Sequence, residues 1–445
     1  MTKILIPEEV KSILSKLNNS GYEAYAVGGC ARDSLIGKTP KDWDICTSAM
    51  PKEVERVFSG EKIIETGLKH GTVTLVRNNI LYEITTFRTD GKYTDGRHPD
   101  NVQYVTSLRE DLLRRDFTIN AMAVDKEGNI IDLNGGLDDL KQKKIRCVGN
   151  PNDRFKEDSL RILRALRFAA RYRFNIDYST KSAIHQSKVL LKNISQERIT
   201  SEFRQIISYA DKHLLMEFSD VIEIIVPEIK ESIGFEQNNP HHIFDVYEHT
   251  ITAIDNAAQN ETIRLALFFH DIGKPKTYIE DENNIGHFPR HPIVGAEMTE
   301  DIMRKMRFDN KIVNRVILLV ENHDLNIAPS LSFARRLINK FGEEFIFELL
   351  EVMKCDKSAQ SSNTDKEKTL LNIFILEKYI KQALNEKNCF SLKDLAVNGN
   401  DLKEFGIPEG PYLGKILKKL LDFVLENPDK NNKEFLLKKV KLDLM

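Results

Sequence analysis

The chain has 445 residues, which is enough for about three domains of ordinary size. Its formal net charge of −2 gives no overall sign of a polyanionic partner, so any such contact must come from local basic patches. No apolar run reaches the about 18 residues that a membrane span needs, and the N-terminus carries acids in an amphipathic helical pattern. We therefore expect a cytoplasmic protein without a membrane segment. The five cysteines are widely spaced and form no C-x-x-C pair, which argues against disulfides and zinc.

The first informative segment is a tight glycine turn that follows a predicted strand over residues 22–27. Gly28 and Gly29 let backbone N–H groups approach phosphate oxygens closely, and Arg32 can pair with phosphate charge. Asp33 follows in the same turn and is counted with this group. The turn therefore predicts binding of a nucleoside triphosphate.

The next predicted strand carries two carboxylates, in the order Asp42-Trp43-Asp44. Strand alternation sends Asp42 and Asp44 to one face and Trp43 to the other. Two neighbouring carboxylates repel each other unless a cation lies between them, and Mg²⁺ suits them because it prefers oxygen ligands. Glu83, on a predicted strand over residues 80–88, is a candidate third catalytic carboxylate. A salt bridge on the strand face is an alternative role for Glu83.

The glycine turn and the two aspartates together resemble the signature of the DNA polymerase beta nucleotidyltransferase superfamily. They are most similar to its branch of class II CCA-adding enzymes and bacterial poly(A) polymerases. The resemblance implies an α+β head, with a mixed sheet and helices, followed by an extended all-helical neck, body and tail. Residues 88–107, which are polar and turn-rich, form a long connection within this head. A functional loop and a tolerated surface insertion both fit that composition.

An arginine pair, Arg114 and Arg115, precedes Asp116 in the next motif. The pair can clamp triphosphate oxygens, while Asp116 and Asn120 can fix backbone turns or the sugar. A solvated salt-bridge cluster is the alternative for such a run taken alone. The segment resembles the second motif of the same family, and residues 132–138 resemble its third motif, which links head and neck.

Residues 154–173 contain seven basic and two acidic side chains. We expect Asp158 and Arg161 to be neighbours on one helix, with Arg164 and Arg167 continuing along the same side. Asp158 can accept a hydrogen bond from the exocyclic amine of cytosine or adenine while Arg161 donates to the adjacent ring nitrogen. Uracil and guanine present a carbonyl and an N–H at those places. The pair therefore predicts selection of C and A without a template, with a helix-surface salt bridge as the alternative.

The family resemblance implies the same roles. The residues that match Asp158 and Arg161 are implied to template the incoming base, and the matching arginines to contact base and phosphate. Glu197 and Arg198 match a neck motif and would brace the nucleotide-reading helix.

A second constellation lies in the predicted helical body, and its order of histidines and aspartates resembles the HD metal-phosphohydrolase superfamily. Imidazole and carboxylate ligands suit a transition metal that activates water. The resemblance implies either a hydrolytic site or a scaffold that keeps a partial metal site. The candidate ligands are His249, His270, Asp271, His291, His323 and Asp324.

The resemblance covers nearly the whole chain and implies transfer of nucleotidyl groups from CTP and ATP to the 3′ end of tRNA, with Mg²⁺ and with release of pyrophosphate. An A-adding or CC-adding enzyme and a poly(A) polymerase are the alternatives, and the long 88–107 segment argues modestly against a CC-only enzyme. Eight lysines from residue 415 onward can contact the tRNA backbone or form a solvated face. The expected domains are a head at 1–150, a neck at 151–235, an HD-type domain at 236–355 and a tail at 356–445.

Overall fold

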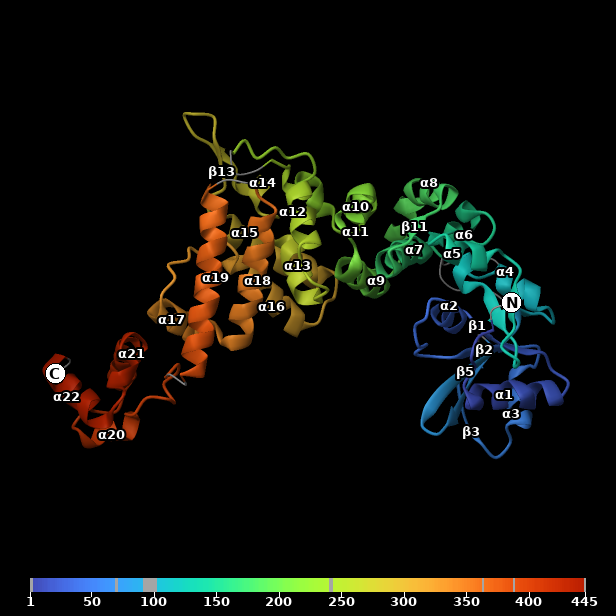
Figure 1. Ribbon diagram of the computed structural model, residues 1–445, viewed down its shortest axis with the longest axis horizontal. Coiled ribbons are helices and arrows are strands. Elements are labelled where there is room, and N and C mark those ends of the chain that lie inside the picture. Colours follow the sequence, from blue (N-terminus) through green and yellow to red (C-terminus); the bar gives the residue numbers. More distant parts are fainter. Residues whose placement is uncertain are drawn as a thin grey trace. The chain divides into compact units, whose positions relative to one another are not determined.

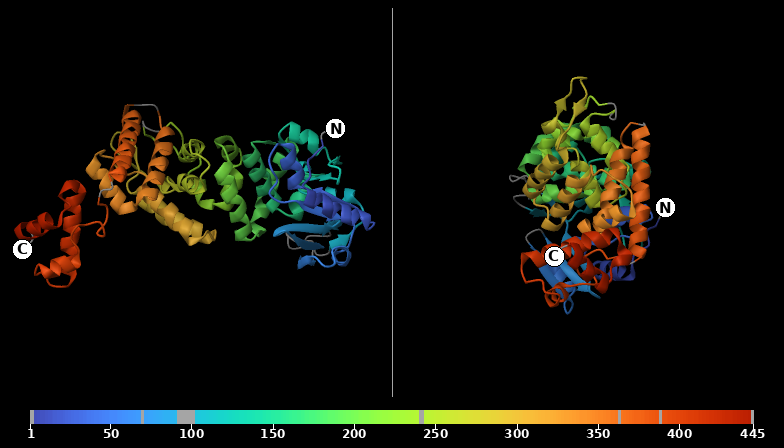
Figure 2. Two further views of the ribbon diagram at one scale, coloured as in Figure 1. Left: turned by 60° about the horizontal axis from the view of Figure 1, so that its bottom comes forward. Right: turned by 90° about the vertical axis from the view of Figure 1, so that its left-hand side faces the viewer.

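A computed structural model of the chain describes residues 3–68, 71–90, 102–239, 243–361, 364–386 and 389–443. The chain divides into two compact units, residues 1–227 and 228–445, and each is described by itself. The first unit begins with a mixed sheet flanked by helices and continues as helices (Figures 1 and 2). The predicted α+β class is confirmed.

The main sheet of the first unit has the strand order β3-β4-β5-β2-β1-β8-β9. Strand β2 runs parallel to β5, and the other neighbours in this sheet are antiparallel. This order places the end of β1 beside the start of β2, and the start of β2 beside β5. The strands are β1 Ala24–Val27, β2 Asp44–Thr47, β3 Lys62–Gly67, β4 Thr72–Arg77, β5 Ile80–Thr86, β8 Met122–Val124 and β9 Ile130–Asp132.

Helices pack on this sheet by their apolar faces. Helix α1 buries Val10, Ile13, Leu14 and Leu17, a spacing that puts them on one side of the helix. Part of the 88–107 segment is regular, because its ends pair as a short antiparallel hairpin, while residues 91–101 lie outside the described residues. The elements are α1 Glu8–Asn19, α2 Gly29–Leu35, α3 Pro51–Val57, β6 Arg88–Asp90, β7 Val102–Tyr104, α4 Leu108–Leu113, η2 Thr118–Asn120 and α5 Gly136–Lys141.

The rest of the first unit is helical apart from one short pair of parallel strands. Helix α7 packs on α9 and buries Ile162, Leu163 and Leu166, while its Arg164 reaches Asp116 of the head. The elements are β10 Lys144–Ile145, α6 Pro151–Glu157, α7 Leu160–Tyr172, β11 Asn175–Ile176, α8 Tyr178–Ser187, η3 Lys188–Asn193, α9 Gln196–Tyr209, α10 Lys212–Glu217 and α11 Ser219–Ile225.

The second unit begins with a helical bundle in which α12, α13, α15, α16 and α18 contact one another. One small antiparallel hairpin interrupts it. The elements are η4 Pro227–Glu231, α12 Val246–Asp255, α13 Glu261–Phe269, α14 Lys274–Thr277, β12 Ile279–Glu280, β13 Gly286–His287, α15 His291–Lys305, α16 Asn310–Asn322, α17 Leu331–Phe341, α18 Glu343–Ser358 and α19 Thr364–Asn385.

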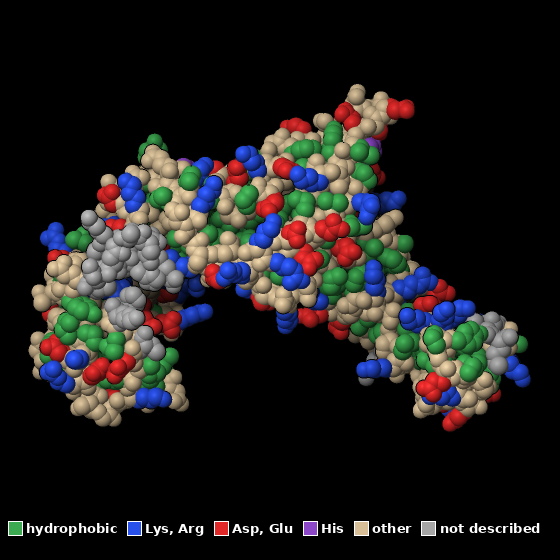
Figure 3. Space-filling model, turned by 180° about the vertical axis from the view of Figure 1, so that it is seen from behind, with side chains coloured by type: hydrophobic (Ala, Val, Ile, Leu, Met, Phe, Trp, Pro, Cys, Tyr) green, Lys and Arg blue, Asp and Glu red, His purple; other side chains and the backbone are tan. Residues whose placement is uncertain are grey.

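The C-terminal helices form a separate apolar cluster that includes Leu402, Leu420 and Leu436. Lysine side chains lie on the surface of these helices, which form the lower right lobe of Figure 3. None of the helices that the structure describes is both long enough and apolar enough to cross a membrane. The elements are α20 Gly399–Glu404, α21 Pro411–Glu426, η5 Pro428–Lys430 and α22 Lys433–Asp443.

Candidate functional site

The glycine turn lies where β1 ends and α2 begins. Gly28 has φ +80° and ψ −125°, a conformation that side chains rarely adopt. A Cβ at this position would lie 3.1 Å from Nη1 of Arg115, while one at Gly29 would lie 3.5 Å from Nη2 of Arg32. The turn therefore holds the backbone close to two guanidinium groups.

Three carboxylates gather beside this turn. Strand β2 begins at Asp44, so Asp42 precedes the strand and the predicted alternation across 42–44 is not formed. The parallel register pairs Ile45 with Ile84, which places Asp44 and Glu83 side by side on one face. Protein atoms around the Asp44 carboxyl displace water, and Glu83 and Asp42 add negative charge, so the pKa of Asp44 is raised although Arg115 opposes this.

These carboxylates are more widely spaced than a closed three-ligand site. Among the described residues, the only trios of candidate ligand atoms within 4.8 Å of one another lie in the second unit. Burial is the largest cause of the raised pKa of Asp44, and repulsion from Glu83 and Asp42 adds to it. A cation among Asp42, Asp44 and Glu83 would relieve this repulsion.

Arg115 is held in place by Asp111, a residue that the sequence analysis missed. Nη2 of Arg115 lies 3.2 Å and Nη2 of Arg114 lies 2.7 Å from the Asp111 carboxylate. Burial alone would raise the pKa of Asp111, but the two arginines lower it. The buried Nε–H of Arg115 finds no acceptor among the described residues. Asp111 lies three residues before Arg114 and four before Arg115, and this helical spacing was the signal in the sequence that they are partners.

Asn120 and Asp116 link the turn to helix α7. Nη1 of Arg32 donates to Oδ1 of Asn120 at 2.5 Å, and Nδ2 of Asn120 donates to Oδ1 of Asp116 at 3.0 Å. Arg164 donates to the other oxygen of Asp116 at 2.6 Å. Burial would raise the pKa of Asp116, but Arg164 and Asn120 lower it to about 2. The buried side chains of Asp116 and Asn120 therefore connect α2 to α7.

Asp158 and Arg161 do not share one helix, contrary to the sequence prediction. Helix α6 ends at Glu157, Asp158 has extended backbone with φ −140°, and α7 begins at Leu160. The carboxylate of Asp158 accepts from the Leu160 N–H at 3.1 Å and from Arg198 at 2.9 Å. Aspartate and serine favour such helix boundaries because their side chains bond to nearby backbone N–H groups.

The basic side chains of α7 are paired with carboxylates from several elements. Arg161 donates to Glu157 at 2.5 Å, and Arg167 donates to Glu202 at 2.6 Å. Arg161 also donates to the carbonyl of Arg114 at 3.1 Å, which connects it to the motif beside the glycine turn. The arginines of α7 therefore reach different elements, since Arg164 pairs with Asp116 of the head whereas Arg161 and Arg167 pair with α6 and α9.

Comparison with known proteins connects this geometry to a family. Residues 24–146 match the Poly A polymerase head domain, residues 173–233 the probable RNA and SrmB-binding site of polymerase A, and residues 293–440 the putative tRNA nucleotidyltransferase domain 2. The CCA-adding enzyme of Lactobacillus delbrueckii subsp. bulgaricus is 34% identical over 436 residues, covering 97% of this chain and 98% of that protein. The chain belongs to the CCA-adding enzyme family.

Solved structures of CCA-adding enzymes agree with this assignment. The enzyme of Bacillus stearothermophilus in complex with CTP has a TM-score of 0.67 at 28% identity, with 98% of each chain covered. The enzyme of Thermotoga maritima complexed with tRNA shares the fold, with a TM-score of 0.63 at 20% identity over 99% of this chain and 97% of that chain. The chain is thus a tRNA nucleotidyltransferase.

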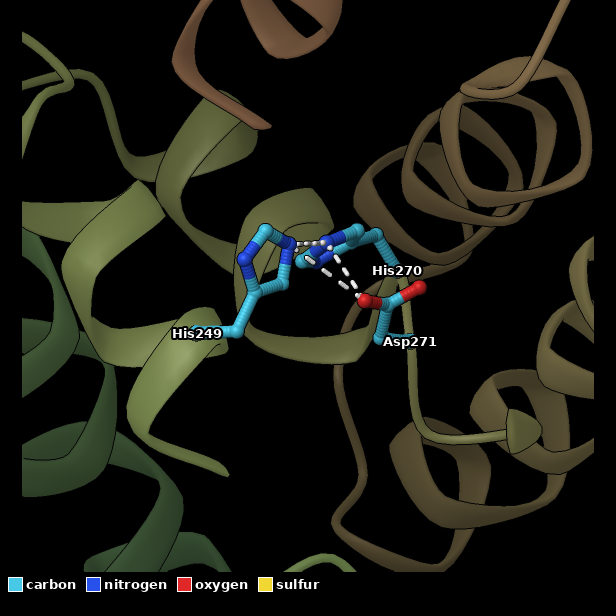
Figure 4. Close-up of side chains that lie close together, drawn as sticks. All are labelled: His249, His270 and Asp271. Carbon is cyan, nitrogen blue, oxygen red and sulfur yellow. Dashed lines mark hydrogen bonds and ion pairs between the residues drawn. The ribbon is translucent and has the colours of Figure 1, made fainter. Parts of the chain in front are cut away.

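The second unit of this CCA-adding enzyme holds a buried histidine and carboxylate cluster. His249 comes from α12, His270 and Asp271 follow α13, and Figure 4 shows these three side chains turned toward one another. His291 begins α15, and His323 follows the end of α16. The cluster therefore collects ligands from four helices of the bundle.

Asp271 is shared between two trios of possible ligands. Its Oδ2 lies 3.5 Å from Nε2 of His249 and 3.2 Å from Nε2 of His270. Its Oδ1 lies 3.5 Å from Nε2 of His291 and 3.7 Å from Nε2 of His323. A carboxylate with one oxygen toward each trio can bridge two metal ions.

Backbone carbonyls fix the orientation of three of the imidazoles. Nδ1 of His270 lies 2.7 Å from the backbone oxygen of Leu267. The matching distances are 2.9 Å from Nδ1 of His291 to the oxygen of Phe288 and 2.7 Å from Nδ1 of His323 to that of Val320. Donation from Nδ1 leaves Nε2 to face the cluster, which is the arrangement of metal-ligating histidines. Burial also lowers the pKa of His291 to about 4, so its ring is neutral near neutral pH.

The predicted ligand Asp324 belongs to neither trio. Its half-exposed carboxylate lies 3.7 Å from Nζ of Lys357 and lines the cavity beside the cluster, not the cluster itself. The buried Asp356 of α18 lies there instead, with its Oδ1 2.9 Å from Nε2 of His249. Its position on the apolar side of α18, three residues after Met353, was the available signal, because a lone aspartate among core residues needs a partner.

Proposed function

We propose that the chain adds C, C and A to the 3′ end of tRNA from CTP and ATP, with Mg²⁺ and with release of pyrophosphate. The single observation that carries the proposal is the meeting of Asp44, Glu83 and Arg115 beside the Gly28 turn. Family membership and the CTP complex of the related enzyme support the choice of substrates. The unpaired, buried cysteines fit a reducing compartment, so we also propose a cytoplasmic location.

Asp42 and Asp44 would hold the magnesium ion, because their oxygens match its preference and their repulsion needs a cation. The ion would supply Lewis acidity to the attacking 3′-hydroxyl and neutralise charge on the α-phosphate. Glu83, beside Asp44, would assist removal of the hydroxyl proton. Arg32 and Arg115 would orient the triphosphate by pairing with its oxygens.

Asp158 and Arg161 would read the Watson–Crick edge of the incoming base. An amine beside a ring-nitrogen acceptor satisfies both side chains, whereas uracil and guanine present the opposite pattern. Each residue already has a protein partner, Arg198 for Asp158 and Glu157 for Arg161. Base reading therefore involves exchange of these pairs, with Arg164 and Arg167 supporting the nucleotide from the same helix.

The test uses tRNA transcripts that end in the discriminator base, in -C and in -CC, each incubated with single labelled nucleotides. Completion of CCA on all three supports the proposal. Addition of A alone to -CC identifies an A-adding enzyme, products that stop at -CC a CC-adding enzyme, and long A tails a poly(A) polymerase. Asp44→Asn should abolish incorporation, while Asp138→Asn, on a side chain with 76% exposure, is the matched control.

We propose a second activity, phosphate-ester hydrolysis, for the histidine cluster of the second unit. The observation that favours it is the bridging position of Asp271 between two ligand trios. The cluster opens into a cavity of about 340 Å³, which Lys274 and Lys357 also line with positive charge suited to a phosphate. A transition metal held there would activate water for attack on phosphorus. HD superfamily membership remains a prediction.

Metal content and hydrolysis of bis(p-nitrophenyl) phosphate test this second activity. Asp356→Asn should remove bound transition metal and hydrolysis together. Asp301→Asn, at an exposed position of α15, is the matched control and should keep both. Equal metal loss in both variants would contradict the ligand assignment, and an unmodified protein that binds metal without hydrolysis would leave a scaffold role.

A further inference from the structure

Tyr172, the last residue of α7, touches both charged residues that follow the glycine turn. Its hydroxyl donates to Oδ1 of Asp33 at 3.0 Å, and the same oxygen accepts from Nε of Arg32 at 2.9 Å. The guanidinium carbon of Arg32 lies 4.8 Å from the centroid of the Tyr172 ring. Tyr172 thus meets α2 through both a hydrogen bond and a cation–π contact.

These contacts close a ring that reaches α7 at two places. From Arg32 the ring continues through Asn120 and Asp116 to Arg164, which lies eight residues before Tyr172 on the same helix. Its other end returns through Asp33 to Tyr172. The six members of this ring, called the α2–α7 ring, are Arg164, Asp116, Asn120, Arg32, Asp33 and Tyr172.

Half of the six members of the α2–α7 ring are buried, and the other three are partly buried. Arg32, Asp116 and Asn120 are buried, and burial together with the Asp33 charge raises the pKa of Tyr172 even though Arg32 opposes this. The hydroxyl therefore remains a donor at physiological pH. Buried and fully paired polar networks permit few alternative arrangements, so the ring fixes α7 relative to α2.

We propose that Tyr172 is a positioning residue for nucleotide selection, because it holds the base-reading helix at a set distance from the triphosphate-binding turn. This inference rests on the proposed roles of α2 and α7 in nucleotide binding. With the distance fixed, a base that Asp158 and Arg161 do not accept displaces its own α-phosphate from the carboxylates. Such a displacement is costly to the rate, since transfer requires alignment of the reacting atoms.

Tyr172→Phe removes the hydroxyl and keeps the aromatic side chain beneath Arg32. The measurement is kcat and KM for all four nucleoside triphosphates on tRNA ending in the discriminator base and in -CC. We expect the preference for CTP over UTP and for ATP over GTP to fall about fivefold to tenfold, the scale of the net contribution of one typical intramolecular hydrogen bond. The change should lie in kcat, with KM for CTP nearly unchanged. Tyr178→Phe, on a side chain with 84% exposure, is the matched control.

A purely structural role for the hydroxyl would slow all four nucleotides by one common factor, and that result, or no change at all, would overturn the inference. Asn120→Ala opens the same ring elsewhere, so the double variant should lose no more selectivity than the worse single variant. If the loss of selectivity in the double variant equals the product of the losses in the two single variants, the inference is also overturned. Asp44→Asn tests the proposed chemistry separately, since incorporation by that variant would refute the catalytic assignment and leave the Tyr172 result standing.

Discussion

At the residue scale, Gly28 serves two requirements that can be separated. Its positive φ disfavours any side chain, and its missing Cβ leaves room for Nη1 of Arg115 at 3.1 Å. Gly37 also has positive φ, at +74°, but nothing lies within 4 Å of its Cβ position. The two glycines therefore differ in what a methyl group would meet.

We predict that Gly28→Ala lowers kcat/KM for CTP at least about 100-fold, because it combines backbone strain with displacement of a phosphate-binding arginine. Gly37→Ala carries only the backbone cost of about 1–2 kcal/mol and should lose stability while keeping most activity. Single-nucleotide incorporation and thermal unfolding of both variants provide the measurement. Equal losses of activity would show that the contact with Arg115 is unimportant.

Asp116 supports stability through its charged form. The pKa of Asp116 in the folded protein is about 2, below the ordinary value of about 3.9. Its contribution to the free energy of unfolding is therefore complete above about pH 3.9 and is lost as the pH falls toward 2. Asp116→Asn should therefore cost up to about 2.6 kcal/mol at neutral pH, and this difference should shrink below about pH 4. Urea unfolding across that range measures it. A difference that is constant with pH, as expected for the exposed Asp138→Asn, would contradict the assignment.

At the scale of elements, the break between α6 and α7 frees the Asp158 side chain from a helical position. Its carboxylate can leave Arg198 for a base without unwinding a turn, because it already lies outside both helices. Only Oδ2 bonds to Arg198, so Oδ1 can keep its hydrogen bond to the Leu160 N–H at the start of α7 while Oδ2 exchanges partners.

Asp158→Ala should relax the choice of base more than it weakens triphosphate binding. We expect UTP incorporation to rise about tenfold relative to CTP, since one charged hydrogen bond is removed from recognition. Asp153→Ala, at an exposed position of α6, is the matched control. If C and A keep their full advantage in the Asp158 variant, another group reads the base.

The strands predicted over residues 22–27 and 80–88 are present as β1 and β5, whereas the strand predicted through Asp42 begins only at Asp44. The partners of charged side chains could not be predicted, because Asp116 with Arg164, or Arg167 with Glu202, join residues far apart in the chain. The exchange of Asp324 for Asp356 has the same origin. Sequence places an aspartate near a histidine, but only the packing of α18 against α12 brings Asp356 to His249.

At the scale of the whole molecule, the division at residues 227 and 228 predicts that metal in the second unit stabilises that unit. Bound ligand at one hundred times its dissociation constant contributes about 2.7 kcal/mol. We expect two calorimetric transitions, and only one of them should move to a lower midpoint temperature when 1,10-phenanthroline removes transition metal. Asp271→Asn should abolish that shift, and His213→Ala, at an exposed position of the first unit, should keep it. Parallel movement of both transitions would contradict the prediction.

The charge pairs around α7 also bear on how this enzyme responds to salt. Asp158 and Arg161 each exchange an ion pair within the protein for contacts with a base, so these steps release no counterions from the tRNA. We expect tRNA to bind to exposed lysines such as Lys418 and Lys441, and such binding would release counterions from the tRNA backbone. Rising ionic strength should therefore lower the affinity for tRNA steeply, while the preference for C and A over U and G stays almost constant.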